Sequence, residues 1–247
     1  MSAAAPQIRP FQPFDLPGMY DVCLRTGDGG RDARPIYRNP HLIGHLYAGP
    51  YPVADPGLTF VVADAAGVAG YVVGTADTVG FERWLDEHWR PGLRAQYPEP
   101  GPEAGMDLGS EPELDLGSAS GPDLGLVPDL GLPDLRSEPG PQLVADDGMQ
   151  DAVLVRRLHH PEEIAPADVL AQYPAHLHID LLPRAQGGGL GRRLITALAD
   201  ALRERGVPGV HLGVEARNTG ARAFYARIGF TVAHQDEGGA LLVLPLS

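Results

Sequence analysis

The chain has 247 residues, of which 43% are hydrophobic, so it can bury one substantial core. Its formal charge of −13 is concentrated between residues 98 and 147, where twelve carboxylates face the single Arg136. This distribution leaves the rest of the chain nearly neutral and argues against nucleic acid as a partner.

Residue usage excludes several chemistries. All 19 basic residues are arginine, which excludes a lysine Schiff base and a lysine-dependent phosphate loop. Cys23 is the only cysteine, so neither an internal disulfide nor a cysteine-based metal site is expected. No long apolar run occurs, and the first residues, MSAAAPQIRP, lack the pattern of a secretory signal. We therefore expect a cytoplasmic protein without membrane contact.

The segment before residue 99 is predicted to form a strand, two helices, a hairpin and a further helix. Asp15 is placed to cap the first helix, which runs through Cys23; we expect Cys23 to pack as a small apolar side chain. The apolar runs at 58–63 and 68–74 flank a DAAG turn, which indicates an antiparallel hairpin. The other predicted elements are a strand at 8–10, a helix after Asn39 and a helix over 81–96 that is interrupted near Pro91.

Residues 99–147 form an acidic segment rich in proline and glycine, in which DLG recurs at Asp107, Asp115 and Asp123. Its leucines follow no sustained helical or strand period, and its composition opposes collapse. We interpret it as a disordered insert in a single domain spanning residues 1–247. A spacer and a partner-docking segment are both compatible with this composition.

Strands alternate with helices after the insert, which predicts a mixed α/β sheet flanked by helices. Residues 190–205 place apolar side chains on one helical face, and Gly206 is expected to end that helix. Strands are predicted at 153–158, 176–182, 210–214, 230–233 and 240–246, and helical segments at 167–172, 190–205 and 219–228.

A glycine-rich turn, QGGGLG from Gln186 to Gly191, joins a predicted strand to a predicted helix. Such a turn lets backbone N–H groups and the positive end of the helix dipole approach pyrophosphate oxygens, and Arg192 and Arg193 add positive charge. A tight turn without a ligand is the alternative. The Gly-Lys-Ser/Thr of a P-loop is missing, and Arg192 occupies the place of the last glycine of a dinucleotide fingerprint.

A second motif runs from Asn218 to Phe230 and reads NTGARAFYARIGF. Asn218 can cap the helix, whose apolar face includes Phe224 and Tyr225. Tyr225 is either a core aromatic or a functional phenol.

Together the two motifs resemble those of GCN5-related N-acetyltransferases: (Arg/Gln)-x-x-Gly-x-(Gly/Ala) is matched at Gln186, Gly189 and Gly191, and Asn-x-x-Ala-x-x-Phe-Tyr-x-x-x-Gly-Phe from Asn218. The resemblance implies a mostly antiparallel sheet with two splayed parallel strands at the acetyl-CoA site, and Tyr225 near the cofactor sulfur. The residues expected to bind acetyl-CoA are Leu181, Leu182, Gln186, Gly187, Gly188, Gly189, Leu190, Gly191, Arg192, Asn218, Phe224 and Tyr225.

Three further segments, at 23–28, 44–51 and 70–77, are similar to the acetyltransferase-like C-terminal domain of the animal O-GlcNAc hydrolase and to stand-alone bacterial acetyltransferases related to it. The glycine loop is degraded in the animal domain, whereas this chain keeps it. The chain contains no glycosidase domain, so hydrolysis of O-GlcNAc is not implied.

Acetyl transfer to an amine needs a proton donor for the thiolate, a polarised carbonyl and an acceptor for the amine proton. Tyr225, whose ordinary pKa is about 10, suits the first task, and the resemblance implies a backbone N–H near Leu181 or Leu182 for the second. His176, His178 and Asp180 alternate along one strand and therefore share a face.

Asp180 also matches an aspartate of the related domain, and it is expected to attract or deprotonate the amine. The open alternatives are polar residues satisfied within the sheet and a His-x-His-x-Asp metal site, although the chemistry requires no metal. The residues expected to contact the acceptor are Tyr47, Tyr51, His178 and Asp180.

The sequence therefore predicts an N-acetyltransferase that moves an acetyl group from acetyl-CoA to a primary amine. The first alternative is a non-catalytic module that binds acetyl-CoA or a protein, and the second is a phosphate-binding protein of another fold. The identity of the acceptor and the assembly state, including a homodimer, stay open.

Overall fold

A seven-stranded sheet forms the centre of the protein, for which a computed structural model describes residues 5–99, 149–162 and 164–246. Every neighbouring pair of strands is antiparallel except β4 and β5, which are parallel. The mixed, mostly antiparallel sheet expected from the sequence is confirmed. In spatial order the strands are β1 (Gln7–Pro10), β2 (Thr59–Asp64), β3 (Gly67–Thr75), β4 (Ala175–Leu181), β5 (Gly209–Glu215), β7 (Gly239–Pro245) and β6 (Thr231–Gln235).

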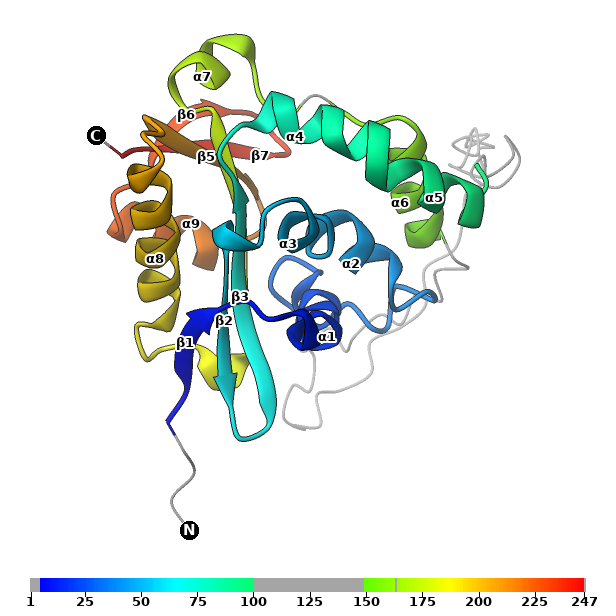
Figure 1. Cartoon of the computed structure of the whole chain (residues 1–247), viewed down its shortest axis with the longest axis horizontal. Coiled ribbons are helices and arrows are strands. Elements are labelled where there is room, and N and C mark those ends of the chain that lie inside the picture. The colour runs from blue at the N-terminus through cyan, green and yellow to red at the C-terminus, as the bar shows by residue number, and fades with distance from the viewer. Residues whose placement is uncertain (1–4, 100–148, 163, 247) are drawn as a thin grey trace, which may run out of the picture.

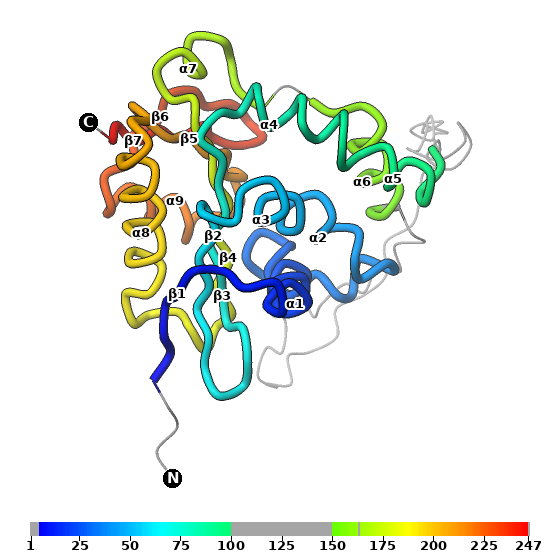
Figure 2. The backbone as a smooth tube through the Cα atoms, in the orientation of Figure 1, coloured from blue at the N-terminus to red at the C-terminus, as the bar shows by residue number. Residues whose placement is uncertain are grey.

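Helices cover both faces of this sheet (Figure 1, Figure 2). One face carries α8 (Leu190–Glu204) and α9 (Thr219–Arg227). The opposite face carries the remaining helices, which are α1 (Leu16–Thr26), α2 (Leu42–Tyr47), α3 (Pro50–Ala54), α4 (Thr78–Trp84), α5 (Arg90–Gln96), α6 (Met149–His159) and α7 (Ala167–Gln172).

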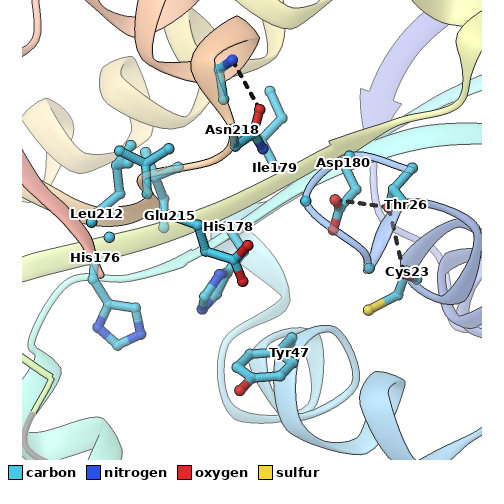
Figure 3. A pocket seen from close by; sticks show the side chains of 18 of the residues that line it. Cys23, Thr26, Tyr47, His176, His178, Ile179, Asp180, Leu212, Glu215 and Asn218 are labelled. Carbon is cyan, nitrogen blue, oxygen red and sulfur yellow. Dashed lines mark hydrogen bonds between the residues drawn. The ribbon is translucent and has the colours of Figure 1, made fainter. Parts of the chain in front are cut away.

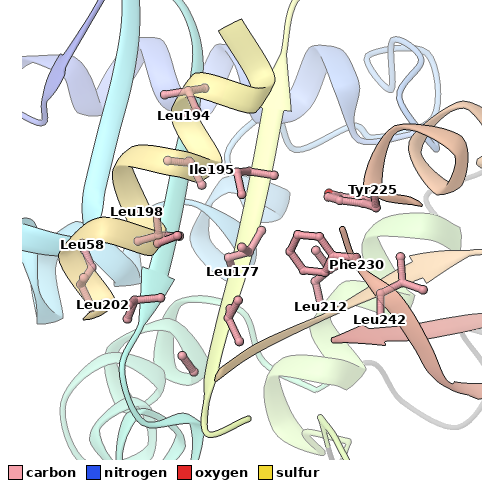
Figure 4. Close-up of a cluster of buried hydrophobic side chains, with 14 of the residues drawn as sticks. Leu58, Leu177, Leu194, Ile195, Leu198, Leu202, Leu212, Tyr225, Phe230 and Leu242 are labelled. Carbon is pink, nitrogen blue, oxygen red and sulfur yellow. The ribbon is translucent and has the colours of Figure 1, made fainter. Parts of the chain in front are cut away.

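The core on the α8 face follows from the periodicity of that helix. Leu194, Ile195, Leu198 and Leu202 recur at spacings of one, three and four, so they lie on one side of the helix, and all four are buried against the sheet (Figure 4). The helix ends one residue before Arg205, and Gly206 follows in the left-handed conformation that favours glycine.

The opposite core is built around α1, where Cys23 is 2% exposed and burial raises the pKa of its thiol. The helix begins at Leu16, as expected, but Asp15 does not cap it with its side chain. The Asp15 carboxylate instead accepts two hydrogen bonds from Arg9, at 2.6 and 2.7 Å, and one from the amide of Gln12. Asp15 therefore ties the end of β1 to the start of α1.

The strand predicted at 153–158 is wrong, because this segment belongs to helix α6. The run of branched apolar residues suggested a strand. In the structure Leu154, Val155 and Leu158 are all buried, the first two in the core on the α1 face, which is the pattern of a helix that packs one side.

Two other helical segments are divided in the structure, of which only the one over 81–96 was expected to be interrupted. The helix expected after Asn39 becomes α2 and α3, which are separated at Ala48 and Gly49. The helix expected over 81–96 begins earlier, at Thr78, and a π-helical turn from Leu85 to Trp89 separates α4 from α5. The interruption therefore comes just before Pro91, which occupies the first turn of α5, where proline is tolerated.

The parallel strands β4 and β5 are paired only at their beginnings. Ala175 lies opposite Val210 and His176 opposite His211, and no pairing continues beyond these two positions. The strands therefore splay apart, which confirms the opening expected in the sheet. No helix in the described part of the chain is long and apolar enough to cross a membrane. The predicted disordered insert at 99–147 lies, apart from Glu99, outside the described residues.

Candidate active site

A cavity of about 1960 Å³ passes through the opening between β4 and β5. At one end it is lined by the glycine turn and α9, and at the other by α1, α2 and α6. The close-up in Figure 3 shows side chains from both strands and from α1 and α2 facing this space. The cavity therefore brings together residues from both sides of the sheet.

The glycine turn has the geometry of an anion cradle. Gly187 and Gly189 have φ angles of 80° and 75°, which disfavour any other residue, and a Cβ on either would meet no atom within 4 Å. Gly191 is different, because its Cβ would lie 3.2 Å from atoms of both Leu181 and Phe224. The turn thus combines open space above the helix start with close packing of α8 against β4 and α9.

The first turn of α8 presents amide groups to this space. Gly189 is the N-cap and has no side chain that could accept a capping hydrogen bond, so the amides that follow it remain donors for a ligand. Leu190 and Arg192 line the cavity with the turn, whereas Arg193 does not. Of the two arginines expected to add charge, the structure therefore brings only Arg192 to the site.

Helix α9 places a phenol at the opening. The side chain of Asn218 accepts a hydrogen bond from the Ala221 amide at 3.1 Å and caps the helix, as predicted. Tyr225 is 8% exposed, and its ring lies beside that of Phe230 (Figure 4) and that of Phe224, each at a centroid distance of 5.3 Å. Burial, followed by the nearby charge of Asp180, raises the pKa of Tyr225, so the phenol is protonated at neutral pH.

The hydroxyl of Tyr225 borders the cavity and makes no hydrogen bond to any residue that the structure describes. A buried phenol that keeps its proton and has no internal acceptor is suited to donate that proton to a ligand.

The two backbone amides considered at the end of β4 differ in their partners. The Leu182 amide donates to the Ala69 carbonyl at 2.9 Å, and the Leu182 side chain is 1% exposed. Because amides alternate between the two edges of a strand, the Leu181 amide points away from β3 toward the opening. On the same side, the Gln186 side-chain amide donates to the Leu181 carbonyl at 2.8 Å. Of the two amides, the Leu181 N–H is therefore the one that faces the cavity.

Asp180 lies deep in the cavity and is held by two hydroxyl groups. Thr26 donates to one carboxylate oxygen at 2.8 Å (Figure 3), and Tyr71 donates to the other at 2.6 Å. Burial raises the pKa of Asp180, and these two hydrogen bonds oppose the rise. The arrangement fixes the position of one carboxylate at the opening between β4 and β5.

His176 is a satisfied core residue. The Thr78 hydroxyl donates to the Pro174 carbonyl at 2.7 Å, so it must accept from Nδ1 of His176, which lies 2.8 Å away. Nε2 then accepts from the hydroxyl of Tyr51 at 2.8 Å. Burial, together with the two neighbouring histidines, lowers the pKa of His176 well below 6.5. Both His176 and Tyr51 therefore serve the packing of the cavity wall.

His178, in contrast, has no hydrogen-bond partner among the described residues. Its ring lies 5.6 Å from the ring of Tyr47 (Figure 3) and 5.5 Å from that of Tyr51. Burial and the nearby His211 lower the pKa of His178 to about 4, so it is neutral at pH 7. Within the described ranges, no three His, Cys, Asp or Glu side chains are arranged to hold a metal ion.

Several residues in or behind the cavity wall were not assigned from the sequence; Thr26, His211 and Arg157 line the cavity, whereas Tyr71 is buried behind it. Thr26 and Tyr71 hold Asp180, and Thr26 belongs to the segment at 23–28 that the resemblance had marked. His211 is fully buried beside His176; its Nδ1 donates to the Tyr173 carbonyl at 2.7 Å and its Nε2 has no partner in the described structure. Arg157 donates to Tyr47, and no local motif marked it.

Comparison with known proteins agrees with this architecture. Residues 163–230 match the acetyltransferase (GNAT) family. The crystal structure of SsHAT is 33% identical over 99% of this chain and all of that chain, with a TM-score of 0.71. A mycothiol acetyltransferase from Nocardia farcinica (strain IFM 10152) is 54% identical over 54 residues, which are 22% of this chain and 18% of that protein.

The protein O-GlcNAcase of Rattus norvegicus is 21% identical over 230 residues, or 93% of this chain. The match covers 20% of that protein, so the chain spans about a fifth of its length. The sheet that opens between β4 and β5, the glycine turn and the Tyr225 phenol at this opening are together the architecture of an acetyltransferase. The chain belongs to the GCN5-related N-acetyltransferase (GNAT) family.

Proposed function

We propose that the protein transfers an acetyl group from acetyl-CoA to a primary amine. The observation that carries the proposal is the cavity between β4 and β5, which joins an anion cradle at one end to a fixed carboxylate and a protonated phenol at the opening. The relatives named as acetyltransferases support the class of reaction.

The residues of the glycine turn fit the pyrophosphate of acetyl-CoA. The backbone from Gln186 to Gly191 and the side chain of Arg192 would hold it, because the positive φ angles aim the amides at open space and the helix dipole favours anions. Phe224 and Asn218 line the cavity beside it. Acetyl-CoA supplies an activated acetyl thioester.

At the reacting end, each group of the chain has one task. The Leu181 N–H can donate a hydrogen bond to the acyl oxygen, since its own strand partner lies on the other side. Tyr225 holds a proton on its hydroxyl for the departing sulfur. The negative charge of Asp180 attracts the ammonium form of the acceptor to this point.

Asp180 acts mainly through its charge. Both of its oxygens already accept hydroxyl hydrogen bonds, and this lowers their tendency to take a proton from the amine directly. The unpartnered His178 is the second group on the same face that can accept a proton, either directly or through water. Tyr47 and His178 belong to the acceptor side of the cavity, and Tyr51 supports it through His176.

The experiment measures binding first and turnover second. Calorimetry should show that the full-length protein binds acetyl-CoA, and release of free thiol with a panel of primary amines should report transfer. Asp180→Asn should raise the KM for the amine while acetyl-CoA still binds, because it removes the charge but keeps the side-chain shape. Asp200→Asn, on the exposed side of α8, is the matched control. Acetyl-CoA binding without transfer to any amine would instead identify a binding module, and the absence of binding would remove the cofactor assignment.

Two further expectations from the sequence, a cytoplasmic location and a homodimer as one assembly, stay predictions.

A further inference from the structure

A group of hydrogen-bond donors lies at the acceptor end of the cavity. Arg157, Tyr37 and Tyr47 all line it, and Nη1 of Arg157 donates to the Tyr47 hydroxyl at 2.9 Å. Because that oxygen accepts from the guanidinium, the hydroxyl hydrogen of Tyr47 remains available for another acceptor. Tyr37 interacts electrostatically with both, and its hydroxyl makes no hydrogen bond within the described chain.

Among the residues that the structure describes, no carboxylate makes a close hydrogen bond to these donors. Arg157 is half exposed, and Glu162, 4.0 Å from Nη2, is 75% exposed, so this pair is weak. Asp151 lies near Tyr37; its Oδ2 accepts from the Asn39 amide, its Oδ1 is buried without a hydrogen-bond partner among the described residues, and it does not line the cavity. Burial, followed by the neighbouring Tyr47, raises the pKa of Tyr37 to about 12, so the phenol stays a donor at neutral pH.

The fold holds this group in a fixed place relative to Asp180. Arg157 is in the last turn of α6, and Leu154 and Leu158 anchor that helix in the core. The ring of Tyr47 lies 5.6 Å from that of His178, and His178 precedes Asp180 by two residues on β4, about 7 Å along a strand (Figure 3). The donors and the Asp180 carboxylate are therefore on the order of 10 Å apart across one cavity.

From this arrangement we infer that the acceptor is a small amine that also carries a carboxylate or a phosphate, separated from the amine by a spacer of several bonds. Asp180 receives the ammonium, and the guanidinium of Arg157 with the two phenols receives the anion. A planar guanidinium binds both kinds of oxyanion through paired N–H groups, which is the property the site uses. The inference rests on the proposed function and adds the substrate class.

Matched probes test this inference. Hexylamine is compared with 6-aminohexanoate, and 4-amino-1-butanol with its phosphate ester, by calorimetry on the full chain saturated with CoA and by thiol release with acetyl-CoA. The anionic member of a pair should bind about 10- to 100-fold tighter, the effect of a hydrogen bond to a charged group. Comparing the two pairs distinguishes a carboxylate from a phosphate ligand.

Variants then assign the preference to the donor group. Arg157→Gln should reduce the ratio of affinities within each pair to near one, and Arg157→Lys should restore only part of it. Arg156→Gln removes the same charge from the preceding, exposed position, which does not line the cavity, and should keep the ratio. If Arg157→Gln does not fold, Tyr37→Phe removes one donor and should lower the ratio several-fold.

Three outcomes overturn the inference. Equal binding of the members of each pair would show that no anion site exists. An equal loss for both members in Arg157→Gln would show that Arg157 only orders Tyr47. No binding of any probe by a protein that binds CoA would exclude the substrate class, while the proposed function would still depend on its own amine panel. Failure to bind acetyl-CoA, in contrast, would reject the proposed function itself.

Discussion

Replacing Tyr225 by phenylalanine tests the proposed proton donor most directly. The hydroxyl has no partner among the described residues, so its removal leaves no buried group unpaired. The ring would keep its contacts with Phe224 and Phe230. We therefore expect a change in stability below about 1 kcal/mol, which is a shift in Tm of less than about 4 °C for a protein of this size.

The effect on turnover should be much larger. Proton transfer by a positioned side chain contributes about 10²- to 10⁴-fold to a rate, so kcat should fall within that range when departure of the thiolate limits it. The affinity for acetyl-CoA should change little, because the packing of the ring persists. In the wild type the raised pKa of Tyr225 keeps the phenol protonated, so its ionisation should not reduce activity below about pH 10.

The assay is single-turnover release of free thiol from acetyl-CoA with an accepted amine between pH 6 and 9, so that product release does not mask chemistry. Tyr173→Phe is the control, because Tyr173 does not line the cavity. Full single-turnover rates for Tyr225→Phe across this range would refute the acid role, and the donor would then be water or another group. A fall in acetyl-CoA affinity that matches the fall in rate would refute the separation of binding from proton transfer.

Two further predictions concern the glycine turn and the histidines. In Gly189→Ala the left-handed conformation of the turn, with φ 75°, should become less favourable by about 1 to 2 kcal/mol, which should weaken acetyl-CoA binding by about 5- to 30-fold in calorimetry. Gly188→Ala is the control, because Gly188 has no positive φ, and it should keep most of the affinity. Equal losses of affinity in the two variants would contradict the reasoning. The pKa of His178 is lowered to about 4 in the folded state, so the unfolded chain binds more protons as the pH falls below 6.5. Stability due to His178 is thus present above pH 6.5 and declines toward pH 4, with a loss of about 2 kcal/mol between pH 7 and 5 in urea titrations. In His178→Asn the pH dependence should be smaller by that amount, and an unchanged dependence would assign it to other groups.

The sequence predicted best what depends on local pattern. The helix α8 has a long periodic apolar face, and its boundaries were found within one residue. The turn from Gln186 to Gly191 was identified because positive φ angles need glycine. The splayed strands were implied by the family resemblance and are confirmed by pairing at only two positions.

The sequence predicted poorly what depends on contacts between distant segments. In α6, the branched residues of the VLV run favour a strand locally, but burial of Leu154 and Val155 in the core on the α1 face decides in favour of a helix. Asp15 has the right residue type and place for a cap, yet Arg9 from β1 takes its carboxylate.

The acceptor side of the site shows the same limit. The residues that hold Asp180, Thr26 and Tyr71, are more than 100 positions away in the chain, so no spacing rule could pair them with it. Tyr51 was expected to touch the acceptor; in the structure it lines the cavity and its hydroxyl is hydrogen-bonded to His176, a contact that the sequence could not reveal. The assignment of individual residues to acetyl-CoA and acceptor stays a prediction.

The short pairing between β4 and β5 also divides the sheet into two groups of strands that are paired with each other at only two positions. Strands β1 to β4 form one continuous ladder, and β5, β7 and β6 form another, so within the described sheet the two ladders are joined by strand pairing only near His176 and His211. A wider opening between β4 and β5 would therefore leave the strand pairing within each ladder intact. Amide hydrogens near these two histidines should exchange with solvent faster than those at the centre of β3 or β7, because strand pairing joins the two ladders at only two positions.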